Sequence, residues 1–272
     1  MSVRVIEGDC LATLRTLPRG SVHACVTSPP YWKKRDYGHD AQIGLEDHPE
    51  QFVDALAAVF DEVRRVIVPG GVAWVNLGDS YAAGGNGGGG SLSRTRQGWR
   101  GLVGRKGWRS PPPGFKDKDL TLVPLVAAAA LRDAGWHLRQ TVIWSKPRAS
   151  EPPRADRPQV SHEFVFMLSN GAACRARNPG EAWWGQSVWE IGEAMSARDH
   201  PAPMPEELAR RCIVAATAPG ETVLDPFGGA GTTGVVADRL GRGAVLCELN
   251  PEYAAFARRR VYGDAPLLAD VT

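Results

Sequence analysis

The pattern of apolar and polar positions predicts strands and helices along most of the chain. Short apolar runs bounded by turn-forming residues predict buried strands over 22–27, 72–77, 136–144, 164–168, 222–225 and 243–247. Apolar residues at helical spacing predict helices over 10–17, 46–68, 120–134, 206–216, 234–240 and 251–261. Strands followed by turns and helices are typical of open α/β sheets, whose ligands bind at the carboxyl ends of the strands.

A rigid segment, Ser28-Pro29-Pro30-Tyr31, follows the strand predicted over 22–27. Two consecutive prolines have a fixed φ and no N–H group, so they present a short shelf of carbonyl acceptors. The tyrosine beside the shelf offers a flat face on which a ring can stack. The segment therefore suits a planar ring with an exocyclic amino group, or it is an ordinary strand-to-loop turn.

A glycine-rich turn follows the strand predicted over 222–225 and leads into a helix. Glycines let the backbone approach a ligand closely, and the helix N-terminus offers free N–H groups. The next strand ends in Glu248, which is placed to accept hydrogen bonds from ribose hydroxyls. A dinucleotide site would have Gly-x-Gly-x-x-Gly directly after the strand, but 225–227 intervene. The pattern thus favours a nucleoside-type cofactor.

Two motifs resemble those of a known enzyme family. Thr-Ser-Pro-Pro-Tyr-Trp at 27–32 and Asp-Pro-Phe-Gly-Gly-Ala-Gly-Thr-Thr at 225–233 are similar to the catalytic and cofactor motifs of the S-adenosylmethionine-dependent DNA amino-methyltransferases. Further similar blocks lie at 7–9, 68–71, 76–81, 142–147, 162–166 and 200–205. The catalytic motif precedes the cofactor motif, as in the permuted β subgroup. The resemblance covers nearly the whole chain.

The resemblance implies a fold. It is a Rossmann-like α/β methyltransferase domain over 1–272, with a mostly parallel, twisted seven-stranded sheet and helices on both faces. One antiparallel hairpin is expected at the sheet edge, formed by 136–144 and 164–168. The order of motifs implies that the chain is circularly permuted.

The resemblance also implies roles for individual residues. The catalytic residues are expected to be Ser28, Pro29, Pro30 and Tyr31, with Tyr31 stacked on the target base. The cofactor, S-adenosylmethionine, is expected to contact Asp9, His200, Pro201, Asp225, Phe227, Gly229, Gly231, Thr232 and Glu248. Asp9 is also expected to cap the helix over 10–17. Asp79 either shapes a turn or approaches the base.

The substrate implied by the resemblance is a base flipped out of double-stranded DNA. Serine at position 28, where many adenine enzymes carry aspartate, favours cytosine N4 over adenine N6. Remoter alternatives are a catalytically idle DNA-binding protein and a methyltransferase for RNA or protein. The resemblance also allows two protein partners, a second copy of the chain and a cognate restriction endonuclease.

The net charge is only +2, but the charges are unevenly distributed. Positions 81–116 hold seven basic residues, eleven glycines and no acid, which indicates either a mobile DNA-contacting loop over 82–118 or a solvated loop. The predicted DNA-binding residues are Arg94, Arg96, Trp99, Arg100, Arg105, Lys106, Trp108 and Arg109. A second segment, 148–199, is expected to help recognise DNA, and its part over 169–199 lacks clear periodicity.

Composition narrows the class of protein further. No apolar run reaches transmembrane length and no signal-peptide pattern opens the sequence, so a cytoplasmic protein is expected. Five scattered cysteines without a Cys-x-x-Cys pair indicate neither disulfides nor a zinc site, and no metal is expected.

Overall fold

A computed structural model describes residues 2–82, 111–112, 114–147, 155–193 and 204–264. The strands are β1 (Val3–Glu7), β2 (Val22–Thr27), β3 (Ile67–Leu77), β4 (His137–Ser145), β5 (His162–Ser169), β6 (Val188–Glu190), β7 (Thr222–Asp225) and β8 (Gly243–Glu248). The helices are α1 (Cys10–Thr16), α2 (Pro49–Val66), α3 (Val123–Asp133), α4 (Glu206–Ala216), α5 (Thr232–Arg239) and α6 (Pro251–Asp264), with a short 3-10 helix, η1 (Ala182–Gly185).

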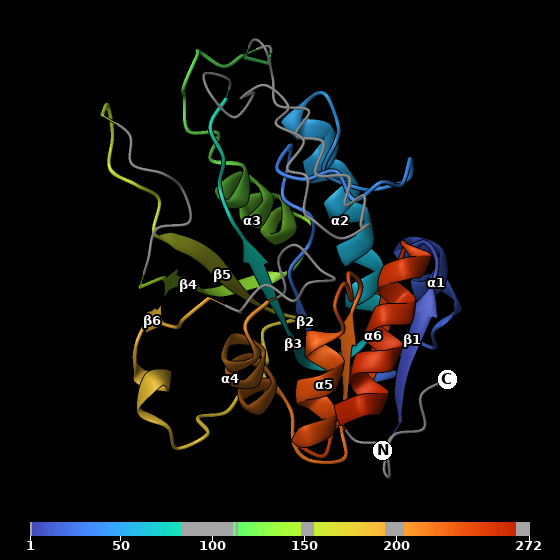
Figure 1. Ribbon diagram of the computed structural model, residues 1–272. Helices are drawn as coiled ribbons and strands as arrows, with labels where there is room; N and C mark the ends of the chain where they lie inside the picture. Colours follow the sequence, from blue (N-terminus) through green and yellow to red (C-terminus); the bar gives the residue numbers. More distant parts are fainter. Residues whose placement is uncertain (1, 83–110, 113, 148–154, 194–203, 265–272) are drawn as a thin grey trace.

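The strands form one mostly parallel sheet in the order β1-β8-β7-β2-β3-β5-β4-β6 (Figure 1). Strand β5 pairs antiparallel with both of its neighbours, β3 and β4, and the other pairs are parallel. The predicted α/β fold with one antiparallel hairpin is therefore confirmed. The described sheet has eight strands rather than seven, because β6 pairs with β4 and covers the outer side of the hairpin. Its three residues are too few to show an alternating pattern in the sequence.

The permuted order is also confirmed. Strand β2, which precedes β7 by almost two hundred residues in the chain, pairs with it directly through Ala24–Val223 and Cys25–Leu224. The segment after β2 and the glycine-rich turn after β7 therefore leave the same edge of the sheet side by side.

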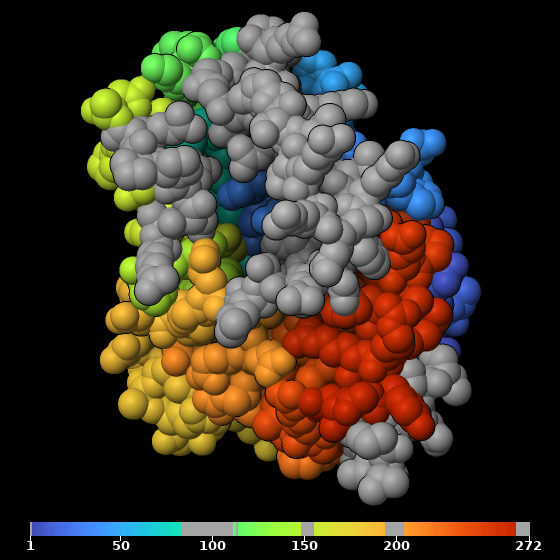
Figure 2. Space-filling model, viewed as in Figure 1, coloured from blue at the N-terminus to red at the C-terminus, as the bar shows by residue number. Residues whose placement is uncertain are grey.

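Helices cover both faces of the sheet. Buried residues of α1, α2 and α3, such as Leu14, Phe60 and Leu131, form one core cluster with the strands. Buried residues of α4, α5 and α6 form the other cluster, which includes Leu208 and Val235. The outer surfaces of α4, α5 and α6 form a continuous area of one side of the molecule, coloured orange to red (Figure 2). None of the described helices has the length and the apolar character needed to cross a membrane.

The element boundaries differ from the predicted ones mainly around α2. This helix ends at Val66, and β3 begins at Ile67 and continues through Gly70 and Gly71. Gly70 donates its N–H to the carbonyl of Asn170, and the N–H of Asn170 bonds the carbonyl of Gly71. These cross-strand bonds hold the two glycines within the sheet, whereas the sequence predicts a helix over 46–68 and a strand that begins only at 72.

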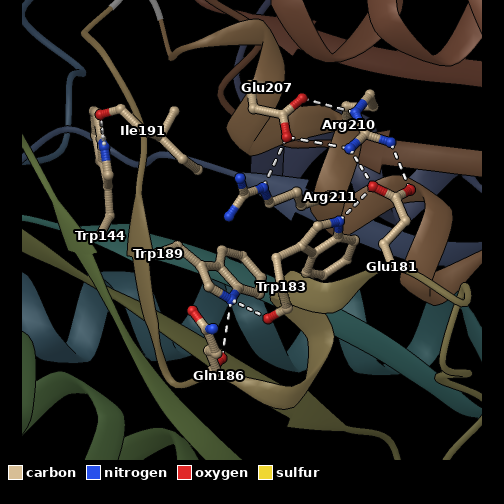
Figure 3. A network of polar contacts seen from close by, with 9 residues as sticks. All are labelled: Trp144, Glu181, Trp183, Gln186, Trp189, Ile191, Glu207, Arg210 and Arg211. Atoms are coloured by element: carbon tan, nitrogen blue, oxygen red, sulfur yellow. Dashed lines mark hydrogen bonds and ion pairs between the residues drawn. The ribbon is translucent and has the colours of Figure 1, made fainter.

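Residues 181–191 of the 148–199 segment pack against α4 (Figure 3). Trp183 and Trp189 are buried, and Arg211 lies over both rings. Glu181 accepts hydrogen bonds from Arg210 and from the indole N–H of Trp183. Residues 148–154 and 194–199 lie outside the described residues, as do 83–110 and 113 of the basic loop. The DNA-recognition role of both segments stays a prediction.

Candidate active site

A cavity of about 480 Å³ lies at the carboxyl ends of the parallel strands. Ten of the thirteen predicted catalytic and cofactor residues line it, namely Asp9, Ser28, Pro29, Pro30, Tyr31, Asp225, Phe227, Gly229, Thr232 and Glu248. His200 and Pro201 lie outside the described residues. The fold thus brings the shelf after β2 and the glycine-rich turn after β7 to one cavity, because β2 and β7 are neighbours.

Glu248 closes the glycine-rich turn from the neighbouring strand β8. Its carboxylate accepts one backbone N–H from Gly229 (2.7 Å) and one from Asn250 (2.8 Å). Gly229 has a φ of +50°, a conformation that favours glycine. Burial raises the pKa of Glu248 above its ordinary value, and these backbone donors oppose the rise. Each carboxylate oxygen keeps acceptor capacity for a ligand hydroxyl.

Asp225 holds the turn from inside. Its carboxylate accepts hydrogen bonds from the hydroxyls of Thr27 (2.6 Å) and Thr233 (2.7 Å) and from the N–H of Phe227 (3.1 Å). Only 3% of the residue is exposed, and burial raises the pKa of this carboxyl group. These bonds order the glycine-rich turn. A direct cofactor contact by Asp225 stays a prediction.

Two other predicted cofactor residues have clear structural roles. Asp9 caps α1 by accepting the N–H of Ala12 at 2.8 Å, as expected, and it also lines the cavity. Gly231 does not line the cavity. It has a φ of +75° at the start of α5, and an added Cβ would lie 3.0 Å from the Cβ of Ala257. The glycine is therefore explained by the packing of α5 on α6, and its role toward a cofactor stays a prediction.

The tyrosine of the shelf is held firmly at its hydroxyl. The Tyr31 hydroxyl donates to Glu163 Oε2 at 2.5 Å and accepts from Asn76 Nδ2. The Ser28 Oγ lies 3.3 Å from both the Tyr31 hydroxyl and Asn76 Nδ2. Burial and the adjacent Glu163 raise the pKa of Tyr31 well above its ordinary value, so the phenol stays neutral.

A lysine completes this polar group. Lys146 Nζ lies 2.7 Å from Glu163 Oε1 and 3.2 Å from Glu193 Oε1, and it lies over the ring of Trp144. Burial alone would raise the pKa of Glu163, but the ammonium group of Lys146 and the hydrogen bonds outweigh burial and lower it. Asn76, Lys146 and Glu163 all line the cavity. No role is predicted for them from the sequence, although each lies in a block that carries the resemblance.

The segment after the shelf forms another wall of the cavity. Asn250 Nδ2 donates to the carbonyl of Tyr37 at 3.1 Å, which ties this segment to the end of β8. The rings of Tyr37 and Tyr253 meet edge to face at 6.4 Å, and both residues line the cavity. No sequence signal singled out these aromatic residues.

Asp79 shapes the chain around it. Its carboxylate accepts hydrogen bonds from the N–H of Ser80 (2.8 Å), the hydroxyl of Thr121 (2.6 Å) and the N–H of Leu122 (3.1 Å). It does not line the cavity. This geometry agrees with the turn-shaping alternative for Asp79.

Comparisons with known proteins agree with this geometry. A family described as DNA methylase (N6_N4_Mtase) matches residues 22–259. Type II methyltransferase M.Cfr9I from Citrobacter freundii is 42% identical over 283 residues, covering 96% of this chain and 88% of the relative. Type II methyltransferase M.SmaI from Serratia marcescens is 40% identical, covering 96% and 91%.

Solved structures show the same fold. A putative DNA modification methylase from Thermus thermophilus, complexed with S-adenosyl-L-methionine, is similar with a TM-score of 0.69 and 27% identity, covering 99% of both chains. The cytosine-N4-specific PvuII DNA methyltransferase has a TM-score of 0.73 over 96% of this chain and 86% of its own. At 21% identity, this second likeness concerns the fold alone. Since the family match covers most of the chain, the protein belongs to the N6/N4 DNA methylase family.

Proposed function

We propose that this protein transfers a methyl group from S-adenosylmethionine to the exocyclic N4 of a cytosine flipped out of double-stranded DNA. The observation that carries the proposal is the shared cavity. The Ser28-Pro29-Pro30-Tyr31 shelf and the glycine-rich turn with Glu248 open into it together. The chain thus offers a place for an amino-bearing ring beside a place for a nucleoside cofactor.

The residues present suit S-adenosylmethionine. The glycine-rich turn permits close approach, and Glu248 retains acceptor capacity for ribose hydroxyls beyond its bonds to Gly229 and Asn250. Tyr37 and Tyr253 offer aromatic surface in the same cavity. When bound, the cofactor supplies an electrophilic methyl group. The protein supplies position and orientation.

The shelf prepares the nucleophile. An exocyclic amino nitrogen is a poor nucleophile because its lone pair is conjugated with the ring. Ser28 Oγ and the Pro29 carbonyl accept the two amino hydrogens, which favours a pyramidal nitrogen and directs its lone pair toward the methyl group. Holding the reacting atoms within near-attack distance contributes about 7–11 kcal/mol at the upper end. No strong base is needed, since the proton leaves a cationic product.

Serine at position 28 supports cytosine as the target. The Ser28 hydroxyl accepts one amino hydrogen without adding a negative charge, whereas many similar adenine enzymes carry aspartate at this position. The second candidate is therefore adenine N6, the other reaction of the same family. An idle DNA-binding protein and a methyltransferase for RNA or protein remain alternatives from other classes.

The proposal extends to the segments outside the described residues. Arginines and tryptophans between 94 and 109 are proposed to contact DNA, with phosphates attracting the guanidinium groups. Neutralising three of these arginines should flatten the salt dependence of DNA binding by about 0.9 per lost phosphate contact. An unchanged slope would leave the solvated-loop alternative. A homodimer, a cognate restriction endonuclease and a cytoplasmic location belong to the same proposal.

The decisive experiment is mass analysis of nucleosides. The protein is incubated with isotope-labelled S-adenosylmethionine and double-stranded DNA, and the DNA is then digested. Labelled N4-methylcytosine supports the proposal, and labelled N6-methyladenine replaces it with the second candidate. Parallel incubations with RNA and with protein test the other classes. No label in any substrate would leave the idle DNA-binding alternative.

A further inference from the structure

A polar network crosses four neighbouring strands beside the shelf. Tyr31 follows β2, Asn76 belongs to β3, Glu163 to β5, and Lys146 follows β4. These strands are consecutive in the sheet. Because β5 runs opposite to the others, its first residues lie at the same edge as the carboxyl ends of β2, β3 and β4. The sheet therefore gathers side chains that are far apart in the sequence.

The network contains a buried ion pair. The side chains of Lys146 and Glu163 are 8% and 11% exposed, and their charged atoms lie 2.7 Å apart. Desolvation offsets most of the attraction in such a pair, so a buried ion pair is weak evidence for a role in stability. The second oxygen of Glu163 bonds the hydroxyl of Tyr31 and the amide of Asn76. The ion pair is thus bonded to one particular side chain at the cavity, Tyr31 of the shelf.

The ring of Tyr31 is restrained at two places. Its hydroxyl is bonded by Glu163 and Asn76, and its Cε2 edge lies against Gly78, where an added Cβ would come within 2.7 Å. A ring fixed at its hydroxyl and at one edge cannot rotate freely about its side-chain bonds. Such pre-organisation lowers the cost of binding a flat ligand.

We infer that Glu163, paired with Lys146, is a positioning residue that fixes the Tyr31 ring for the target base. The inference rests on the proposed function and adds to it the residues that set the orientation of the base. Glu163 acts through the hydroxyl of Tyr31. Replacing Glu163 should therefore matter while that hydroxyl is present and matter much less when it is absent.

A double-mutant cycle tests this dependence. Glu163→Gln keeps the side-chain shape and removes the charge, and Tyr31→Phe removes only the hydroxyl. The turnover of DNA and the affinity for DNA are measured for the four proteins, with cofactor affinity followed by calorimetry. We expect Glu163→Gln to lower turnover about tenfold in the parent and to have little further effect in Tyr31→Phe. Cofactor affinity should stay unchanged.

Two sets of controls separate positioning from folding. Glu62→Gln removes another carboxylate of an ion pair, with Arg65 on α2, and should leave turnover unchanged. Lys146→Arg keeps the positive charge and should retain more turnover than Lys146→Met. This second comparison also serves if Glu163→Gln does not fold. In the free protein, the ring-carbon NMR signals of Tyr31 should shift in Glu163→Gln, since its hydroxyl loses a charged partner.

The outcomes are distinct. Losses that multiply in the double mutant, or an unshifted Tyr31 signal, would overturn the inference while the proposed function stands. A fall in cofactor affinity equal to the fall in turnover would overturn it as well, because Glu163 would then act on the whole cavity. Absence of any methylated DNA base with the parent protein overturns the proposed function, and this inference with it.

Discussion

The two halves of the cavity are held together in different ways. The half formed after β7 and β8 uses two carboxylates, Asp225 and Glu248, whose described partners are hydroxyls and backbone N–H groups. The half formed after β2, β3 and β4 has a carboxylate, Glu163, paired with an ammonium group. Burial raises the pKa of both acids in the first half, whereas Lys146 lowers the pKa of Glu163.

This difference matches what each half is proposed to do. Backbone donors and short loops define a turn of fixed shape, which suits a cofactor that is always the same molecule. A charged pair beside an aromatic ring fixes the direction of one side chain, which suits a base that must enter and leave. The comparison therefore predicts that substitutions in the two halves change different measured quantities.

The largest effect is expected at Ser28. Ser28→Ala should lower the turnover number by about 100-fold, as when one pre-organised hydrogen-bonding group is removed from an active site. Cofactor affinity should change little, since Ser28 belongs to the half formed after β2, β3 and β4, which is proposed to hold the base. Ser21→Ala is the matched control, because the Ser21 Oγ is buried without a hydrogen-bond partner among the described residues. Normal turnover in Ser28→Ala would remove that hydroxyl from the mechanism.

The second-largest effect is expected in the half formed after β7 and β8, which is proposed to hold the cofactor. Glu248→Ala should weaken cofactor binding by about 1–3 kcal/mol, because the ribose hydroxyls and the N–H groups of Gly229 and Asn250 lose a charged acceptor. Calorimetric titration with S-adenosylmethionine measures the change. Glu252→Ala removes an exposed acid four residues away and should have no such effect. An equal cofactor affinity for parent and Glu248→Ala would exclude the ribose contact.

A smaller effect is expected from Gly78→Ala. The added methyl group would lie 2.7 Å from the Tyr31 ring, so the ring must move. We expect DNA binding to weaken by about 1 kcal/mol through strain, with cofactor binding unaffected. Gly263→Ala is the control, because no atom of the described residues lies within 4 Å of the added Cβ. If Gly78→Ala weakens cofactor binding as much as it weakens DNA binding, the two halves do not act separately.

The smallest effect is a difference in the pH dependence of stability. The pKa of Glu163 is lowered from 4.5. Its contribution to the free energy of unfolding is therefore present above pH 4.5 and is lost as the pH falls through the folded-state pKa. The pKa of Asp225 is raised from 3.8. Its contribution to the free energy of unfolding is therefore complete below pH 3.8 and is lost as the pH rises through the folded-state pKa.

Urea unfolding at a series of pH values tests this contrast. The stability difference between the parent and Glu163→Gln should shrink as the solution is acidified. The difference between the parent and Asp225→Asn should shrink as the pH is raised. Slopes of the same sign for the two variants would contradict the proposed difference between the halves.

The two halves were not equally predictable from the sequence. Asp225 bonds the N–H of Phe227 and Glu248 bonds that of Asn250, each two residues away. Such local contacts lie within one continuous motif, so the glycine-rich turn can be predicted from the sequence. The Tyr31–Glu163 contact joins residues 132 positions apart, and no local pattern encodes it.

The remaining differences have similar causes. Strand β6 is a three-residue element whose pairing with β4 depends on neighbours far away in the sequence. The buried tryptophans of the 148–199 segment, Trp183 in η1 and Trp189 in β6, lie on elements of four and three residues. These elements are too short to show a period, and the two rings pack in one cluster with α4. The strands and helices around the two motifs were predicted closely, since each shows its own apolar period.

Asp225 has a consequence for how such a chain can be rearranged in evolution. Its carboxylate accepts hydrogen bonds from Thr27 at the end of β2 and from Thr233 at the start of α5. Thr27 and Asp225 are 198 positions apart in the sequence, and the bond between them fixes the distance between the two halves. This link does not run through a peptide connection. A gene rearrangement that exchanges the order of the two segments would leave the same carboxylate between the same hydroxyls. The spacing between the two halves of the cavity therefore does not depend on the order in which the chain carries them.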